Sequence, residues 1–323
     1  MQSINALSLT SNARDWLANS RHPRLLHVFD CACNLINERR EVLSLVTQQI
    51  GNGPFNLVVE EDICFSEHVN IGSPISIPGN QITLGDLVIN TTRAKLWFAC
   101  PDWEVLHAKR VNILNQLKKS LITNYQVRGL DTGFTHLPWY GSPALVRLKP
   151  HGARVSRTVP GTTAQPYSTT VFHPKLPITN YQFSDALIFA VTNADFPSSL
   201  RSASKLAGLG AGLTPAGDDF IMGVIYAASI IHPPEIARVL AEEITDLTAL
   251  LTTSLSAAWL RSAGRGEAGI LWHKFFEALS SGDPMHIQEA MDKILAVGET
   301  SGADAMAGFT SLVIYWGEYC SNL

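Results

Sequence analysis

The pattern of apolar residues changes along the chain, and this change limits the fold classes open to it. Before residue 100 the apolar runs are short and are separated by turn-forming pairs such as Pro78-Gly79 and Gly85-Asp86. Short runs bounded by such residues are typical of strands. After residue 180 the apolar residues recur at the three- and four-residue spacing of helices. The sequence therefore predicts an α+β protein, with a β-rich N-terminal domain followed by a mostly α-helical C-terminal domain.

The expected domain boundary follows from the segment between these two patterns. Residues 104–124 have helical periodicity, whereas residues 128–178 are rich in Gly and Pro and predict a long loop. We therefore assign residues 1–195 to the β-rich domain, with this helix and loop included, and residues 196–323 to the α-helical domain.

Two apolar runs carry more specific expectations. Residues 25–36 predict one buried strand, in which Cys31 and Cys33 serve as small core residues rather than metal ligands. Residues 235–260 have apolar positions at helical spacing and predict one continuous helix.

Composition limits the classes of partner. Hydrophobic residues make up 46% of the chain and charged residues 16%, which suits a protein with sizeable buried cores. The net charge is -4, and no basic run interleaved with aromatics occurs, so a nucleic-acid-binding surface is not favoured. No apolar stretch reaches the roughly 20 residues that span a bilayer, and the first residues lack the features of a secretory signal. We expect a cytoplasmic protein that binds neither nucleic acid nor membrane.

The strongest functional signal is the glycine-rich sequence GLGAGLTPAGDD at residues 208–219. Glycines at every second position permit unusual backbone conformations and let backbone amides approach a ligand closely. Thr214 suits a helix N-cap and Pro215 the first helical position. A glycine loop that leads into a helix N-terminus is a ready anion site. The ligand-binding residues expected here are Gly208, Gly210, Gly212, Thr214 and Gly217.

This segment has an alternative interpretation as architecture. It lacks the lysine of a nucleotide-binding P-loop, and it follows a helix-like stretch rather than a strand, unlike a dinucleotide fingerprint. The residue types fit equally well a tight turn between two packed helices, with Asp218 and Asp219 stabilising the helix start. Two carboxylates there would repel a phosphate unless they face away or a cation such as Mg²⁺ bridges them to it. The sequence leaves the metal unknown.

A second segment repeats the spacing of the first. The pattern Gly-x-Asp-x-x-x-Gly occurs at residues 217–223 and again at residues 302–308. Each copy places an Asp and a Gly four residues apart on one helix face. The simpler interpretation is two helices packed through small residues, and the sharper one is that both helix starts line a single pocket. In that pocket the expected catalytic groups are Asp218, Asp219 and Asp304, and Ser301 and Gly302 add to the ligand-binding residues.

One charged cluster is a weaker candidate. Arg261, Arg265 and Glu267, in RSAGRGEAG, have the chemistry to hold a carboxylate or phosphate ligand. Their setting between apolar segments fits a turn between helices better.

The two glycine-rich segments resemble a bacterial family long of unknown function. The matching sequences are GLGAGLTPAGDDFIMG at 208–223 and VGETSGADAMAG at 297–308, and NLINERREVLSLV followed by GNGPFNLVV resembles the family's early strands. One member of this family is a subunit of oxamate carbamoyltransferase in anaerobic allantoin degradation, a part of purine catabolism. Many relatives have Pro, Ser and His where this chain has Ala211, Ala216 and Glu299, so the resemblance implies no catalytic role for these side chains.

The resemblance implies a transferase subunit within a multi-subunit complex. The expected substrates are carbamoyl phosphate and oxamate or a similar small acid, and the expected partners are other subunits. Carbamoyl transfer needs positioning and charge stabilisation more than covalent catalysis, which suits an anion site at a glycine loop. Two alternatives stay open: a non-catalytic ligand-binding or scaffold subunit, and a self-contained phosphotransferase, which the missing P-loop lysine disfavours.

Overall fold

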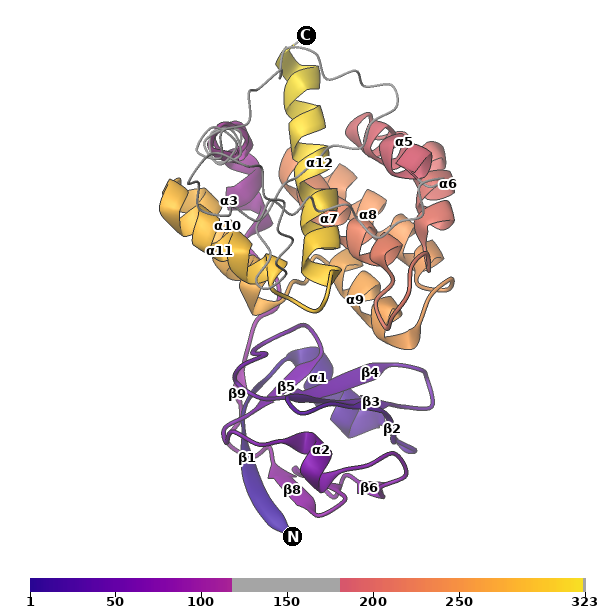
Figure 1. Cartoon of the computed structure of the whole chain (residues 1–323), viewed down its shortest axis with the longest axis vertical. Coiled ribbons are helices and arrows are strands. Elements are labelled where there is room, and N and C mark those ends of the chain that lie inside the picture. The colour runs from indigo at the N-terminus through magenta and orange to yellow at the C-terminus, as the bar shows by residue number, and fades with distance from the viewer. Residues whose placement is uncertain (118–180, 322–323) are drawn as a thin grey trace, which may run out of the picture.

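The computed structural model of the protein describes residues 1–117 and 181–321. Its strands lie in the N-terminal part and most of its helices in the C-terminal part (Figure 1). The predicted α+β class, with a β-rich region followed by a helical region, is confirmed. The loop predicted over 128–178 lies outside the described residues, as does the part of the 104–124 helix beyond residue 117.

The N-terminal part is a mixed sheet with a few short helices. Its described strands are β1 (Gln2–Leu9), β2 (Arg24–Val28), β3 (Ala32–Ile36), β4 (Val42–Val46), β5 (Asn56–Val59), β6 (Ile75–Ser76), β7 (Gln81–Leu84), β8 (Leu87–Asn90) and β9 (Lys95–Leu96), and its helices are α1 (Ser11–Asn19) and α2 (Phe65–His68). The strand order is β2-β3-β4-β5-β1-β8-β7-β6, and β9 also pairs with β1. β1 is central, because it pairs antiparallel with β5 and parallel with β8 and β9.

The single strand predicted over residues 25–36 is wrong. These residues form the antiparallel hairpin of β2 and β3, with a turn around Asp30. The turn is stabilised by α2, because the Asp30 carboxylate accepts a hydrogen bond from Ser66 Oγ at 2.5 Å. Cys33 lies fully buried in β3, whereas Cys31 lies in the turn and is partly exposed.

The helical part begins before the glycine-rich loop and continues to the end of the described chain. Its helices are α3 (Trp103–Ala108), α5 (Tyr181–Thr192), α6 (Phe196–Leu206), α7 (Ala216–Ile231), α8 (Pro234–Thr248), α9 (Ser254–Gly264), α10 (Ile270–Ser281), α11 (Pro284–Leu295) and α12 (Ser301–Ser321). Every residue of α7 except Ser229 is buried, so α7 is the centre of this part. None of the helices in the described ranges combines the length and the apolar character that crossing a bilayer requires.

The single helix predicted over residues 235–260 is also wrong. The chain forms α8 and α9 and breaks between residues 249 and 253. Thr253 is the N-cap of α9, and its side chain accepts a hydrogen bond from the Ser256 amide at 3.1 Å. The break matters for the site, because it brings Leu251 and Thr252 against the glycine-rich loop.

The strand-rich and helical parts have separate hydrophobic cores. Leu106 of α3 and Leu187 of α5 belong to the helical core. The change from one core to the other therefore falls between β9 and α3, earlier than the boundary at residue 195 that the sequence suggests. The reason is packing: the apolar face of the segment that begins at Trp103 lies against α7, not against the sheet.

Candidate functional site

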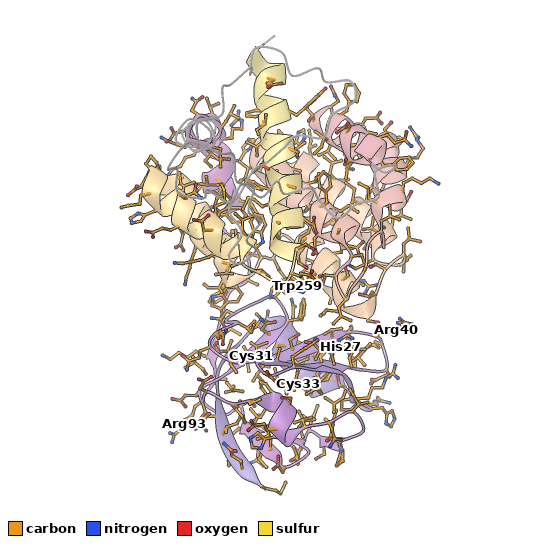
Figure 2. The ribbon with its side chains drawn as sticks, viewed as in Figure 1. His27, Cys31, Cys33, Arg40, Arg93 and Trp259 are labelled. Carbon is orange, nitrogen blue, oxygen red and sulfur yellow. The ribbon has the colours of Figure 1, made fainter. Side chains whose placement is uncertain are left out.

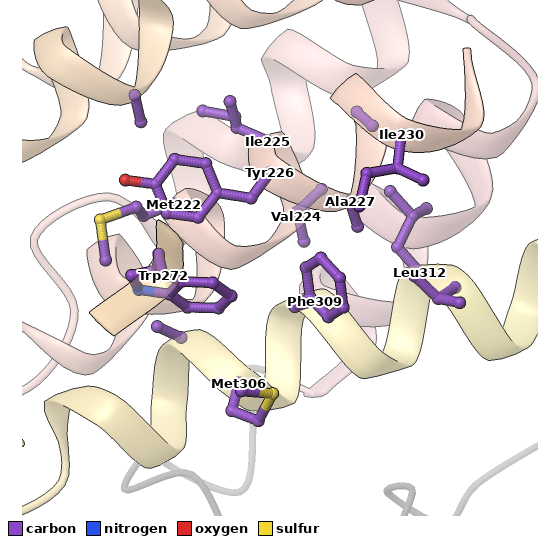
Figure 3. Close-up of a cluster of buried hydrophobic side chains, with 14 of the residues drawn as sticks. Met222, Val224, Ile225, Tyr226, Ala227, Ile230, Trp272, Met306, Phe309 and Leu312 are labelled. Atoms are coloured by element: carbon purple, nitrogen blue, oxygen red, sulfur yellow. The ribbon is translucent and has the colours of Figure 1, made fainter. Parts of the chain in front are cut away.

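Helices α7 and α12 lie side by side and run in the same direction (Figure 3). Met222 and Met306 lie towards one end of the pair, and Ile230 and Leu312 towards the other. A parallel pair brings two helix N-termini together, and each N-terminus carries a partial positive charge from the backbone dipoles. The pair therefore creates an environment that favours negative charge.

The glycines that end the two repeated motifs permit this close pairing. A side chain on Gly223 would collide with the carbonyl oxygen of Ala305, and one on Gly308 would collide with the carbonyl oxygen of Phe220. Phe220 and Ala305 each follow the Asp of their motif, so the crossing has approximate twofold symmetry. The helices thus touch backbone to backbone, and the repeated spacing is explained by this contact.

The two helix starts also meet through side chains. The hydroxyls of Thr214 and Ser301 are hydrogen bonded to each other at 2.7 Å. The carboxylates of Asp219 and Asp304 are close enough that the charge of Asp304 raises the pKa of Asp219. The structure therefore brings the two repeated segments together at one place.

Asp219 is the most unusual titratable group at this place. Its residue is only 5% exposed, and burial raises the pKa of its carboxyl to about 8. This value already includes the smaller raising effect of the Asp304 and Asp218 charges and the opposing effect of the hydrogen bonds with Ser301 and Thr214. An aspartic acid with a pKa of about 8 holds its proton at neutral pH, so it is able to donate a hydrogen bond.

One oxygen of Asp219 lacks a hydrogen-bond partner among the described residues. Its Oδ2 atom is buried and accepts no hydrogen bond within the described part of the chain. A buried polar atom without a partner costs about 1–3 kcal/mol. A bound molecule that supplies a partner would recover this free energy.

Asp218 differs from Asp219 because both of its carboxylate oxygens accept hydrogen bonds. Its Oδ1 accepts from the Gly208 amide at 2.8 Å, and its Oδ2 accepts from Ser256 Oγ at 2.7 Å and from the hydroxyl of Thr252. Burial raises its pKa, and these hydrogen bonds oppose the shift. Asp218 thus ties the glycine-rich loop to the start of α9. Thr252 and Ser256 were not expected as partners of Asp218, because the sequence predicted one continuous helix over residues 235–260.

The glycines of the loop divide into two groups. Gly208, Gly210 and Gly212 have positive φ angles of 72°, 119° and 102°, which favour glycine. Residues 210–213 are exposed, and their amides donate no hydrogen bond to any residue that the structure describes. These amides are available to an anion.

Gly217 belongs to the second group, and Gly302 of the second segment resembles it. The backbone amides of both glycines already donate hydrogen bonds within the protein. The Gly217 amide donates to the Leu209 carbonyl at 2.9 Å, and the Gly302 amide donates to the Val297 carbonyl at 3.1 Å. Side chains on these glycines would collide with the ends of α6 and α11. Their presence is therefore explained by helix packing.

The predicted N-cap of α7 is wrong by one residue. Pro215, not Thr214, is the capping position, and it makes no side-chain cap. The Thr214 hydroxyl is hydrogen bonded to Ser301 instead. The first turn of α7 is satisfied by the backbone instead, because the amides of Gly217, Asp218 and Asp219 donate to the carbonyls of Leu209 and Pro215.

A hollow in the molecule lies away from this place. A cleft of about 340 Å³ is lined by α1, the β3–β4 turn and α9. None of the residues expected at the glycine-rich site lines it, whereas Arg261 and Arg265 of the weaker charged candidate do. The helix-start site is instead a surface site, with exposed loop amides beside a buried carboxyl. Among the described residues, no three His, Cys, Asp or Glu side chains are grouped to hold a metal ion. Mg²⁺ at Asp219 and Asp304 would need further oxygens from a ligand.

The fold and the site define a two-part α+β protein whose glycine loop adjoins a parallel pair of helix N-termini. Comparison with known families is consistent with both parts. Residues 5–96 match the AllH family N-terminal domain, and residues 206–313 match the family described as oxamate carbamoyltransferase subunit AllH. Together the matches cover most of the chain, which belongs to the AllH family. No solved structure matches it significantly. The family resemblance inferred from the sequence is confirmed.

Proposed function

We propose that this chain is a subunit of a carbamoyltransferase that acts on carbamoyl phosphate and oxamate or a similar small acid. Membership of the AllH family supports the role of an oxamate carbamoyltransferase subunit. A multi-subunit complex, a cytoplasmic location and a role in allantoin degradation are parts of this proposal.

The proposed anion site is the junction of the glycine-rich loop with the N-termini of α7 and α12. The observation that carries it is the parallel pairing of these helices beside exposed loop amides. Backbone amides and two helix dipoles favour a bound phosphate. Gly210 and Gly212 permit the loop geometry, and the hydroxyls of Thr214 and Ser301, which are hydrogen bonded to each other, would turn to donate to the ligand.

Protonated Asp219 removes the main objection to an anion here. A charged carboxylate would repel phosphate, whereas a carboxylic acid donates a hydrogen bond to a phosphate oxygen. Carbamoyl transfer breaks the bond between the carbamoyl carbon and the phosphate oxygen and forms a bond to the acceptor nitrogen, which loses a proton. Donors fixed around the phosphate stabilise the negative charge that this oxygen gains. Asp218 contributes by holding the loop, and Mg²⁺ bound with the substrate would bridge Asp304 to the phosphate.

The test is Ser301→Ala in the complex reconstituted with its partner subunits. Loss of one hydrogen bond to a charged ligand costs about 1.5–3 kcal/mol, so the KM for carbamoyl phosphate should rise about tenfold or more. Ser204→Ala is the matched control, because Ser204 is partly exposed on α6 and donates only to the Arg201 carbonyl. An unchanged KM for Ser301→Ala would refute the site.

A scaffold subunit without a ligand is the second candidate. It is favoured by the burial of Asp218 and Asp219 and by the packing role of Gly217 and Gly302. In that case Ser301→Ala should leave the KM unchanged and weaken assembly of the complex instead. Measuring assembly by size-exclusion chromatography beside the KM separates the two candidates.

A further inference from the structure

The cleft between the strand-rich part and α9 has the size of a small-molecule site. Its volume is about 340 Å³, within the range that holds a small metabolite. Its lining comes from both parts of the chain: α1, the β3–β4 turn, Phe55 and α9. It shares no lining residue with the glycine-rich loop, so it is separate from the proposed carbamoyl phosphate site.

Positive charge gathers in this cleft. Two carboxylates line it, Asp15 and Glu41. Four arginines line it, namely Arg39, Arg40, Arg261 and Arg265. The whole chain has more acidic than basic residues and a net charge of -4, so this cluster runs against the overall charge. Such a concentration of guanidinium groups in a hollow attracts anions.

Two of the arginines are already paired. Arg265 Nη2 lies 2.7 Å from Glu267 Oε2 and is held in place by that ion pair. Arg39 Nε lies 3.4 Å from Glu41 Oε2. Glu267 in turn accepts a hydrogen bond from Asn12 of α1 at 2.6 Å. These pairs shape the wall of the cleft, and neither of them involves Arg40 or Arg261.

Arg40 and Arg261 retain most of their donors. The Arg261 guanidinium makes no ion pair or hydrogen bond with any other residue in the described ranges, and the Arg40 guanidinium donates only to Ser254 Oγ, at 3.2 Å. Each guanidinium has five N–H donors in a planar fork that matches a carboxylate or a phosphate.

The backbone of Arg40 adds a second, independent observation. Its φ angle is 61°, in the left-handed region that non-glycine residues rarely adopt. Glycine or asparagine would fill this turn position with less strain. The arginine instead stands at the edge of the strand-rich part that faces the helices (Figure 2), and its side chain reaches α9. Backbone strain of this kind is concentrated at functional sites.

The two walls of the cleft are held together by backbone hydrogen bonds and by one aromatic contact. The Ala268 amide donates to the Ala99 carbonyl at 2.8 Å, and the Ile270 amide donates to the Asn52 carbonyl at 2.9 Å. The rings of Phe55 and Trp259, whose centroids lie 4.8 Å apart, pack edge to face between the two parts. A ligand would therefore meet two walls whose relative position is already fixed, which lowers the entropic cost of binding.

We propose that this cleft binds a small anionic ligand, and that Arg40 and Arg261 recognise its carboxylate or phosphate group. The two guanidinium groups come from opposite walls, so a ligand held by both also bridges the strand-rich and helical parts. The proposal does not depend on the carbamoyltransferase role.

The test is calorimetric titration of the full chain with inorganic phosphate and, separately, with oxalate, at constant ionic strength. Binding of one of the two anions identifies the group that the cleft takes. Arg261→Gln should weaken that binding about tenfold or more, because it removes charge-assisted hydrogen bonds. Arg238→Gln is the matched control, since Arg238 is exposed on α8 and pairs only with Glu242. It removes the same charge and should leave the affinity unchanged.

Arg40→Gly separates binding from folding. Glycine relieves the left-handed strain, so the thermal unfolding midpoint should stay the same or rise while anion affinity falls about tenfold. Unfolding of the variant cannot produce that combination.

Three results would overturn the proposal. One is that neither anion binds the parent chain, and another is that Arg40→Gly and Arg261→Gln bind as tightly as the parent. The third is that Ser301→Ala, and neither arginine variant, loses the binding. That result would place the anion at the glycine-rich loop.

Discussion

Gly223 of α7 and Gly308 of α12 hold equivalent positions, and each packs against the backbone of the other helix at the residue after its aspartate. This reciprocal contact sets the distance between the helices. It also places Asp219 and Asp304 beside each other at the helix starts. The same two glycines therefore determine both the packing of the helical core and the geometry of the proposed site.

The first prediction concerns this contact. Gly308→Ala should destabilise the protein by about 2–3 kcal/mol or more, because the new methyl group collides with the Phe220 carbonyl and forces the helices apart. Ser229→Ala should change stability by less than about 0.5 kcal/mol, since Ser229 bonds only within its own helix. Urea unfolding of both variants measures the difference, and equal midpoints would contradict the crossing.

The second prediction concerns the loop anchor. Asp218→Ala leaves the Gly208 amide and the hydroxyls of Thr252 and Ser256 without their acceptor. The expected loss of stability is about 2–3 kcal/mol, with faster amide hydrogen exchange in residues 208–214. Asp246→Asn, on the exposed face of α8, serves as the control. Unchanged exchange in the loop would show that Asp218 does not hold it.

The sequence was sufficient to predict the α+β class and the meeting of the two repeated motifs. Periodicity distinguished short strands from long helices because the two have different side-chain repeats. It failed where the chain turns without Gly or Pro. Residues 249–251 are apolar and hide the break between α8 and α9, for which Thr253 was the only local signal. Within residues 25–36, Asp30 was the only local signal of the turn between β2 and β3.

Only part of the arginine cleft was within reach of sequence reasoning, which named Arg261 and Arg265 as a weaker anion-binding candidate but did not connect them with Arg40. Arg40 lies in a turn of the sheet and Arg261 lies in α9, and their meeting depends on how two separate cores pack. The loop glycines show the same limit. A side chain on Gly210 would meet the Ala216 amide nitrogen at 2.7 Å, so any variant there is strained whether or not the loop binds a ligand. Thr214 and Ser301 are therefore better test positions. The roles of these residues and of Asp219 stay predictions.

The third prediction is a pH dependence of stability. The pKa of Asp219 is raised from 3.8 to about 8 on folding, so between these pH values the folded state binds more protons than the unfolded state. The free energy of unfolding should therefore fall as pH rises from about 4 to about 8, and Asp219 should contribute no further change above that. Asp219→Asn cannot titrate and should be more stable than the parent at pH 8. Identical pH profiles of unfolding for the two proteins would show that Asp219 does not titrate in this way.

The last prediction concerns the effect of the Asp219 proton on ligand binding. If protonated Asp219 donates to the anion, binding at the loop should weaken as pH rises through about 8, because the ionised carboxylate repels the ligand. Sulfate is the suitable probe, since its own charge stays constant over this range. Asp219→Asn keeps the shape and donates through its amide, so it should bind sulfate with little dependence on pH. Both proteins should also carry Arg261→Gln, so that sulfate bound in the arginine cleft does not add to the binding measured at the loop. A pH dependence that persists in Asp219→Asn would place the titrating group elsewhere and remove Asp219 from the proposed site.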